Sequence, residues 1–252
     1  MSETRLIQFL NRMLRNRLTS RLFFSQRFSW EIAGLTRKLT MEAILRGISD
    51  EETFWKTGRE DANKLLKFID ESSVVLDVGC GIGRVMKFVA AKCKEIHGVD
   101  TSTLILRRAK AEMKDLKNCD FHRCDFKKIT GLPVNSFDLV YSFFTLQHME
   151  KEDAYVCLLQ IYSLLKTGGI TYIQFPDLLS DHFFALFQNY ALSGSKYGAR
   201  VRFYTRPEIE KLCEGVGLEI IDYAQENENV FVTGTKRALV AAAGKRLKRD
   251  IS

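Results

Sequence analysis

The chain of 252 residues has no long hydrophobic run, no secretory signal pattern and no internal repeat or low-complexity tract. The longest uncharged stretch covers residues 182–195, which is shorter and more polar than the roughly 20 apolar residues that a membrane span requires. The N-terminus contains arginines but no apolar segment closed by a small-residue cleavage site, so we expect no secretory signal. These absences predict a single soluble, cytoplasmic domain with appendages, because 252 residues bury one large core comfortably.

The cysteines do not form a disulfide framework. Six are scattered without regular spacing, which suits reduced thiols in a cytosol. Cys119, His122 and Cys124 resemble part of a zinc site, but alternate residues of a strand face opposite ways, so Cys119 points away from the other two. No second ligand cluster is evident in the sequence, and we expect no metal site.

The net charge of +7 is concentrated at the two ends of the chain. Residues 1–30 carry six arginines and one glutamate, and residues 235–252 carry six basic residues and one aspartate. Each end is therefore +5, which leaves −3 for the middle of the chain. The basic run over 245–249 is expected to be a solvated, frayed tail.

An amphipathic pattern precedes residue 25. Apolar residues recur at steps of three and four between residues 6 and 18, and Arg5, Arg12 and Arg15 lie off that stripe. This pattern predicts a basic amphipathic helix. Three roles remain open: a helix that packs on the domain or caps a cofactor, which we favour, peripheral docking of residues 1–24 on an anionic membrane, or contact with nucleic acid.

The most informative segment is an apolar run over residues 74–78, interrupted by Asp77 and followed by Gly79, Gly81 and Gly83. The run is typical of a buried strand, and the glycines require a sharp turn that lets the backbone approach a ligand. A nicotinamide or flavin site would need the spacing G-x-G-x-x-G, and a P-loop would need G-K-[ST]. Neither pattern is present.

Further acidic residues follow predicted strands. The strand over 94–100 ends in Asp100, 17 residues after Gly83, which suits a carboxylate that accepts hydrogen bonds from ribose hydroxyls. The strand over 118–125 ends in Asp125, which Phe126 follows. The segments 136–148 and 164–176 indicate a fourth strand with its loop and then a helix, turn and fifth strand.

These five segments, in this order over residues 74–176, resemble the class I S-adenosylmethionine (SAM)-dependent methyltransferases. The resemblance implies an α/β fold: a doubly wound, seven-stranded mixed sheet of order 3-2-1-4-5-7-6, with strand 7 antiparallel. It also implies SAM as cofactor and S-adenosylhomocysteine as product. In such a site Asp77 would face the methionine ammonium, and Asp125 would bind the adenine amine. The cofactor-binding residues that we expect are Asp77, Gly79, Cys80, Gly81, Gly83, Asp100, Thr101, Asp125, Phe126 and Phe143.

The acceptor side is less defined. His148, at the tip of the fourth strand, orders the loop, lines the acceptor pocket or acts as a general base, in decreasing order of preference. The segment 177–205 lies where the family places substrate-recognition insertions, and it is interpreted as a packed helix or a mobile lid hinged at residues 194–198. The substrate-binding residues that we expect are His148, His182, Tyr197, Arg200 and Tyr204, with His148 also the catalytic candidate.

Three divisions of the chain are predicted: a helical N-terminal extension over residues 1–56, the SAM-binding domain over 57–235, and a basic tail over 236–252. Helices are expected over 57–70, 85–92, 102–116, 153–165 and 207–215, with a terminal strand pair over 218–223 and 230–233. Trp55 is interpreted as a core or cofactor-capping residue.

The sequence favours methyl transfer to the oxygen or nitrogen of a small-molecule, lipid or glycan-precursor acceptor. The alternatives are methylation of RNA or protein, or a SAM-fold binding module that uses its basic ends. The segment over residues 142–145 lacks the Asn-Pro-Pro-Tyr signature that methyltransferases acting on nucleic-acid base amines carry after strand 4, which lowers that alternative.

Overall fold

The structure is a computed structural model, and it describes residues 26–45, 48, 50–193 and 200–237. The predicted N-terminal helix, the predicted hinge over 194–198, Tyr197 and residues 238–252 of the basic tail lie outside these residues. None of the helices within the described ranges is long and apolar enough to cross a membrane.

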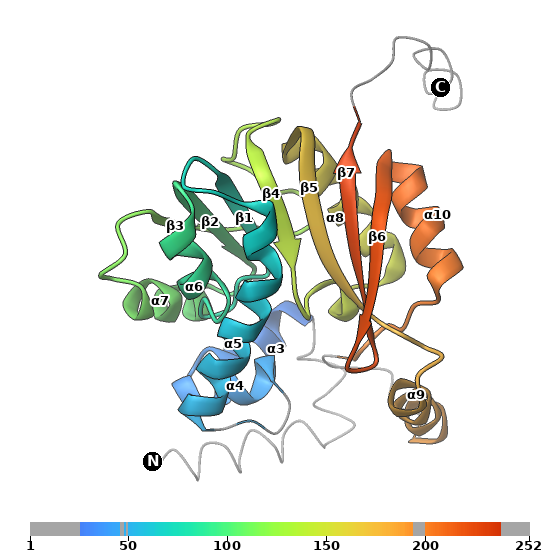
Figure 1. Cartoon of the computed structure of the whole chain (residues 1–252). Coiled ribbons are helices and arrows are strands. Elements are labelled where there is room, and N and C mark those ends of the chain that lie inside the picture. Colours follow the sequence, from blue (N-terminus) through green and yellow to red (C-terminus); the bar gives the residue numbers. More distant parts are fainter. Residues whose placement is uncertain (1–25, 46–47, 49, 194–199, 238–252) are drawn as a thin grey trace.

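The centre of the molecule is a seven-stranded sheet of order β3-β2-β1-β4-β5-β7-β6 (Figure 1). Strand β7 pairs antiparallel with both β5 and β6, and the other neighbours are parallel. The predicted fold is therefore confirmed. The strands are β1 (Val74–Val78), β2 (Glu95–Asp100), β3 (Cys119–Arg123), β4 (Phe137–Ser142), β5 (Leu165–Pro176), β6 (Leu218–Glu226) and β7 (Asn229–Lys236).

Helices cover both faces of the sheet, as the alternation of strands and helices requires. The helices are α3 (Gln26–Ala33), α4 (Arg37–Ile44), α5 (Glu51–Leu65), α6 (Met86–Val89), α7 (Thr103–Glu112), α8 (Lys151–Leu164), α9 (Asp181–Ser193) and α10 (Arg206–Val216). Three short 3-10 turns are η1 (Leu66–Phe68), η2 (Ala90–Lys92) and η3 (Leu146–His148).

The two larger apolar clusters pack on the sheet, one on each face, and a third cluster joins α4, α5 and α7. One cluster joins α5, α6 and α7 to side chains such as Val75, Ile96 and Leu139. The other joins α8 and α10 to side chains such as Leu76 and Val140. Because β1 and β4 are covered on both faces, their side chains are apolar in nearly continuous runs, as in other buried parallel strands.

The connection between β3 and β4 differs from the other parallel crossovers because residues 124–136 contain no helix. On the face that α8 and α10 cover, Ile129 and Leu132 of this connection pack against the core in place of a helix. The β2–β3 end of that face is therefore thinly covered.

Most predicted elements agree with the structure to within a few residues, but one helix start is wrong. We predicted a helix entry at Thr57, whereas α5 begins at Glu51 and is capped by Asp50, whose side chain accepts a hydrogen bond from Thr53 N at 2.8 Å. Asp50 is the better cap because its carboxylate is also favoured by the positive end of the helix dipole. The predicted domain boundary at residue 57 thus falls inside α5.

The helix predicted over residues 85–92, after the glycine turn, is confirmed to within one residue: α6 begins at Met86 and the 3-10 turn η2 continues it to Lys92. Residues 81–85 form turns. Three glycines with positive φ close to one another prevent an earlier helix start.

The N-terminal helices are attached to α7. The carboxylate of Glu31 accepts hydrogen bonds from Ser102 Oγ and from the backbone N–H groups of Thr103 and Leu104 at 2.9–3.2 Å, which satisfies the first turn of α7. At the other end of α7, Arg37 pairs with Glu112 at 2.6 Å. The helices α3 and α4 are thus held beside the carboxyl ends of β1 and β2.

Substitution of Gly58 tests the close contact between α5 and the glycine turn. An added Cβ would lie 2.1 Å from the backbone oxygen of Arg84. Glycine to alanine in a helix usually stabilises by about 1 kcal/mol. We instead expect Gly58→Ala to lower the free energy of unfolding by about 1–3 kcal/mol, because the backbone must move apart.

Urea unfolding measured by circular dichroism checks this prediction. Glu60→Ala, an exposed substitution in the same helix, is the matched control and should stay within about 0.5 kcal/mol of the parent protein. A Gly58→Ala variant that is as stable as the parent would show that the two segments do not press together.

Candidate functional site

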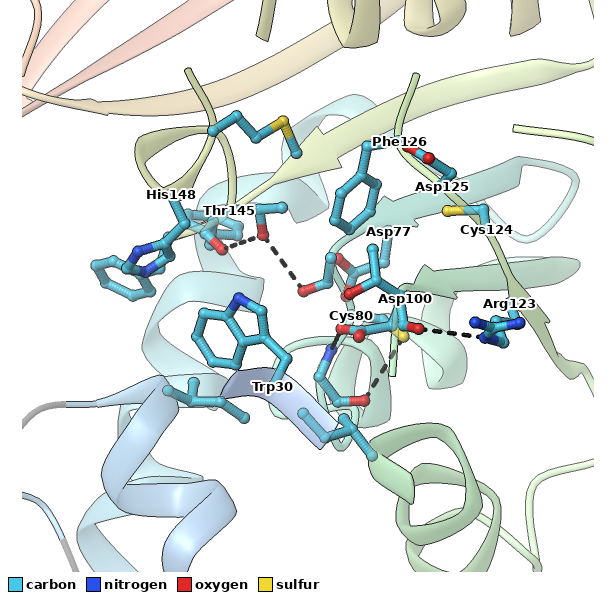
Figure 2. Close-up of a pocket in the computed structure, with 18 of the residues that line it drawn as sticks. Trp30, Asp77, Cys80, Asp100, Arg123, Cys124, Asp125, Phe126, Thr145 and His148 are labelled. Atoms are coloured by element: carbon cyan, nitrogen blue, oxygen red, sulfur yellow. Dashed lines mark hydrogen bonds between the residues drawn. The ribbon is translucent and has the colours of Figure 1, made fainter. Parts of the chain in front are cut away.

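A cavity of about 380 Å³ lies at the carboxyl ends of β1, β2 and β4, beside α3 and α4. This volume lies within the usual range for a small-molecule site. Figure 2 shows Trp30 and His148 on one side of the cavity and Asp125 and Phe126 on the other. The predicted residues that line it are Asp77, Gly79, Cys80, Gly81, Asp100, Thr101, Asp125, Phe126, Phe143 and His148.

The glycine turn forms the floor of the cavity. Gly79, Gly81 and Gly83 have φ values of 84°, 55° and 84°, a region that disfavours residues with a Cβ. A Cβ on Gly79 would lie 1.9 Å from Thr145 Oγ1, and one on Gly83 would lie 2.0 Å from Met113 Cε. Gly83 therefore serves packing against α7 and does not line the cavity.

Asp77 is almost completely buried, at 4% exposure. Its Oδ2 accepts a hydrogen bond from the Tyr141 hydroxyl at 2.8 Å. Burial raises the pKa of Asp77 to about 7, while the Tyr141 hydrogen bond and the positive charge of Arg84 oppose the increase. A cationic ligand group beside Asp77 would favour its ionised form.

Asp100 ends β2 and lies at the centre of the cavity wall. Its two oxygens accept hydrogen bonds from the backbone N–H groups of Gly81, at 3.2 Å, and Ser102, at 2.9 Å. Burial raises the pKa of Asp100 to about 6, against the effect of these N–H groups. A carboxylate oxygen has two lone pairs, so each oxygen retains capacity for a ligand hydroxyl.

The far end of the cavity follows β3. Asp125 is exposed, and its Oδ1 accepts from Lys127 N at 3.1 Å. Phe126 is half-buried and packs against the α8-side core, so its ring is fixed at the cavity wall. Arg123 donates to the backbone oxygen of Thr101 at 3.3 Å, which ties the ends of β2 and β3 together.

The loop after β4 carries His148 and contains backbone strain. Phe144 has a φ of 56°, which is uncommon for a residue other than glycine and is often found at functional sites. Its N–H donates to Gln174 Oε1 at 2.6 Å. His148 is 9% exposed, and its ring meets the edge of Trp30 with 5.1 Å between centroids.

Of the other predicted substrate residues, the three that the structure describes do not line the cavity. His182 lies in the first turn of α9, 3.9 Å from Glu228 in the β6–β7 turn, with its side chain 64% exposed. The Arg200 guanidinium lies over the Tyr190 ring, and Tyr204 is fully buried against Phe175. The structure does not bring these residues together with His148.

The predicted packed helix over part of 177–205 is present as α9. Three aromatic residues of this helix, Phe183, Phe187 and Tyr190, contact Phe203, with 5.8–6.3 Å between ring centroids. No residue of α9 is buried, and Figure 1 places the helix beneath the β6–β7 turn.

Several cavity residues were missed by the sequence analysis: Trp30, Ile44, Arg84, Thr145 and Met149. Trp30 and Ile44 belong to helices whose position depends on tertiary contacts. Arg84 directly follows the glycine turn, and this position in the sequence could have identified it as a cavity residue. It is 3% exposed, and its Nη2 lies 2.7 Å from Asp61 Oδ2. Trp55, in contrast, packs on Phe54 and Phe88 and lies away from the cavity lining.

Comparison with known proteins identifies the central part of the chain. Residues 75–169 match the family described as "Methyltransferase domain". Cycloartenol-C-24-methyltransferase of Arabidopsis thaliana is 37% identical over 105 residues, which are 40% of this chain and 30% of that protein. A tRNA N(3)-cytidine methyltransferase of Homo sapiens is 25% identical over 194 residues, which are 72% of this chain and 66% of that protein. The chain spans less than half the length of several curated relatives that it matches.

Solved structures agree on the fold. Magnesium protoporphyrin IX methyltransferase of Synechocystis PCC 6803, crystallised with bound SAH, superposes with a TM-score of 0.60 at 15% identity. The superposition covers 87% of this chain and 98% of that one, and at such identity it shows the fold alone. Residues 75–169 therefore belong to the methyltransferase domain family, within a seven-stranded sheet that has the topology of the class I SAM-dependent methyltransferases.

Proposed function

We propose that this protein is a SAM-dependent methyltransferase that acts on a small-molecule, lipid or glycan-precursor acceptor. The observation that carries the proposal is that Asp77, Asp100 and Asp125, which end or follow three neighbouring strands, line one cavity together with the glycine turn. The family match over residues 75–169 and the fold support it.

Each residue has a specific role in this proposal. Asp77 pairs with the methionine ammonium, and the backbone of Gly79, Cys80 and Gly81 packs against the methionine portion. Asp100 accepts from the ribose hydroxyls. Thr101, Asp125 and Phe126 line the cavity at the end that would hold the adenine. Phe143 forms the wall on the β4 side.

The cofactor would supply a methyl group already activated by the positive sulfonium charge. The chain therefore needs to orient the acceptor and exclude water, and a demanding set of catalytic residues is unnecessary. Trp30, Ile44 and Met149 provide apolar surface for this purpose. His148 is the imidazole that lines the cavity, and it would take the acceptor proton if the acceptor is a hydroxyl.

The nature of the acceptor end supports the choice of substrate class. Its lining is aromatic and aliphatic. Three of the cationic lining residues, Arg123, Lys127 and Lys128, belong to the Asp125 end, and the fourth, Arg84, is paired with Asp61. Such a lining suits an apolar or uncharged acceptor. The second candidate is RNA methylation, which the match to a tRNA methyltransferase over 72% of the chain favours.

Label transfer tests the proposed function. The full chain is incubated with methyl-labelled SAM and cell extract separated into small-molecule, lipid, RNA and protein fractions. We expect label in the small-molecule or lipid fraction, and none with the Asp100→Ala variant. Label in the RNA or protein fraction would replace the proposed acceptor, and no SAM binding at all would remove the proposed activity.

The ribose contact predicts a large effect of Asp100→Ala on SAM affinity. Hydrogen bonds to a charged group contribute about 1.5–3 kcal/mol each, so the loss of two should weaken SAM binding by at least about 100-fold. Calorimetry measures this, with Asp115→Ala, an exposed change just after α7, as the control. If Asp100→Ala binds SAM like the parent while NAD competes equally well, the cofactor assignment is wrong.

Asp77 predicts the pH dependence of binding. Its raised pKa means that the ligand-free folded state holds a proton more tightly than the unfolded state does, so the free energy of unfolding should fall as pH rises from about 4 to 7. The ammonium of SAM pairs with the ionised carboxylate, so affinity should rise over the upper part of this range, through about pH 7.

Thermal melts between pH 5.5 and 7.5, with and without SAM, measure both trends. Asp77→Asn should bind SAM weakly and with a flatter pH dependence than the parent. Equal pH dependence in the parent and Asp77→Asn would assign the titration to another group, such as Asp100.

A further inference from the structure

A second group of ligand-type side chains lies on the sheet away from the cavity. Glu95, His97 and Asp120 each offer one metal-ligand atom, and these atoms all lie within 4.8 Å of one another. Glu95 and His97 are two residues apart on β2, so they share a face of the sheet. Asp120 is the registered partner of His97 on β3. Two strands thus assemble one group of oxygen and nitrogen donors.

The imidazole of His97 is held in one orientation. Its Nε2 lies 2.9 Å from Glu95 Oε1, and its Nδ1 lies 3.1 Å from His122 Nε2. The ring also packs at a right angle against Phe137, with 5.4 Å between centroids. Without an ion, Nε2–H donates to the Glu95 carboxylate. A metal ion would displace that proton, and Nδ1–H would then donate to His122 Nε2. Metal-binding histidines commonly have such a partner on the second ring nitrogen.

The group is accessible from outside. It lies on the sheet face that α8 and α10 cover, at the β2–β3 end where residues 124–136 form no helix. Asp120 is exposed, and the Glu95 side chain is 39% exposed, whereas that of His97 is 13% exposed. The donors therefore have a fixed base and an open side, through which an ion and its water ligands can enter.

The group is also separate from the proposed SAM site. None of its three residues lines the cavity. His97 precedes Asp100 by three residues, which is about 10 Å along a strand.

We propose that Glu95, His97 Nε2 and Asp120 bind a divalent transition-metal ion, with His122 as a positioning residue for the His97 ring. Ligand atoms on a tetrahedral Zn²⁺ ion with bonds of about 2 Å lie about 3.3 Å apart, so small side-chain rotations bring these donors to an ion. An imidazole with two carboxylates favours Zn²⁺ or a similar ion over Mg²⁺ and Ca²⁺, which prefer oxygen ligands throughout. The ion would join β3, the edge strand, to β2.

This proposal revises the expectation of no metal site. The predicted partial set of Cys119, His122 and Cys124 is still not a site, because Cys119 packs against the α7-side core and Cys124 against the opposite one. Only His122 of that set takes part, and it does so indirectly. The proposal does not depend on methyl transfer.

Calorimetry with ZnCl₂ tests the site in the full chain without a polyhistidine tag, after removal of metals with EDTA and dialysis. We expect one equivalent to bind, with a melting temperature that rises with Zn²⁺ concentration. His97→Ala and Asp120→Asn should each weaken binding at least tenfold. His182→Ala, at an exposed histidine near Glu228, is the matched control and should bind like the parent.

Two further measurements separate this site from other binding. Circular dichroism confirms that the variants are folded, and Asp120→Asn serves best because its side chain is exposed. Co²⁺ replaces Zn²⁺ as an optical probe, because a thiolate ligand would add a strong near-ultraviolet charge-transfer band that oxygen and nitrogen ligands lack. Such a band, absent binding, or a loss smaller than tenfold in either His97→Ala or Asp120→Asn would overturn the proposal.

Discussion

The close backbone contact at the glycine turn determines how the rest of the site is arranged. Residues 79–83 leave β1 and turn back at once, with the N–H groups of Gly79 and Cys80 both donating to Val99 O at the end of β2. The turn meets side chains from the β4 loop, α4 and α7 on its outer sides. No room remains for a side chain at the three glycine positions, so the positions of these three elements depend on the same few glycines.

Two acidic side chains are buried beside the glycine turn. Asp77 and Asp100 lie nearly out of water at the ends of neighbouring strands, which raises the pKa of each. Backbone N–H groups and the Tyr141 hydroxyl compensate part of the cost of burial. The nearest buried cation, Arg84, is itself paired with Asp61. A cavity with this imbalance favours a ligand that carries positive charge, as SAM does.

The sequence predicted the parts of the structure that local pattern determines. The order of strands, the glycine turn and the three acids at or just after the carboxyl ends of β1, β2 and β3 depend on residues close together in the chain, and ten predicted residues line the cavity. The opposite wall depends on how α3 and α4 pack against α7, where Glu31 accepts hydrogen bonds at its start and Arg37 pairs with Glu112 at its end. These contacts join residues 70 or more positions apart, so no local sequence pattern indicates them. Trp30 was missed for that reason. His182, Arg200 and Tyr204 were proposed because of where segment 177–205 falls in the chain. In the structure His182 lies near the β6–β7 turn, Arg200 packs on α9 and Tyr204 is buried in the core.

The attachment of α3 to α7 has a consequence for how molecules exchange with the cavity. Trp30 forms part of the wall, and the next residue, Glu31, supplies three hydrogen bonds to the start of α7. Moving the indole outward with its helix therefore breaks three hydrogen bonds to a charged carboxylate, which at about 1.5–3 kcal/mol each contribute roughly 4.5 kcal/mol or more together. An opening of that cost is populated in fewer than about one molecule in a thousand. The rate at which ligands enter and leave by this route therefore depends on the hydrogen bonds with which Glu31 caps the start of α7, the helix on the other side of the cavity.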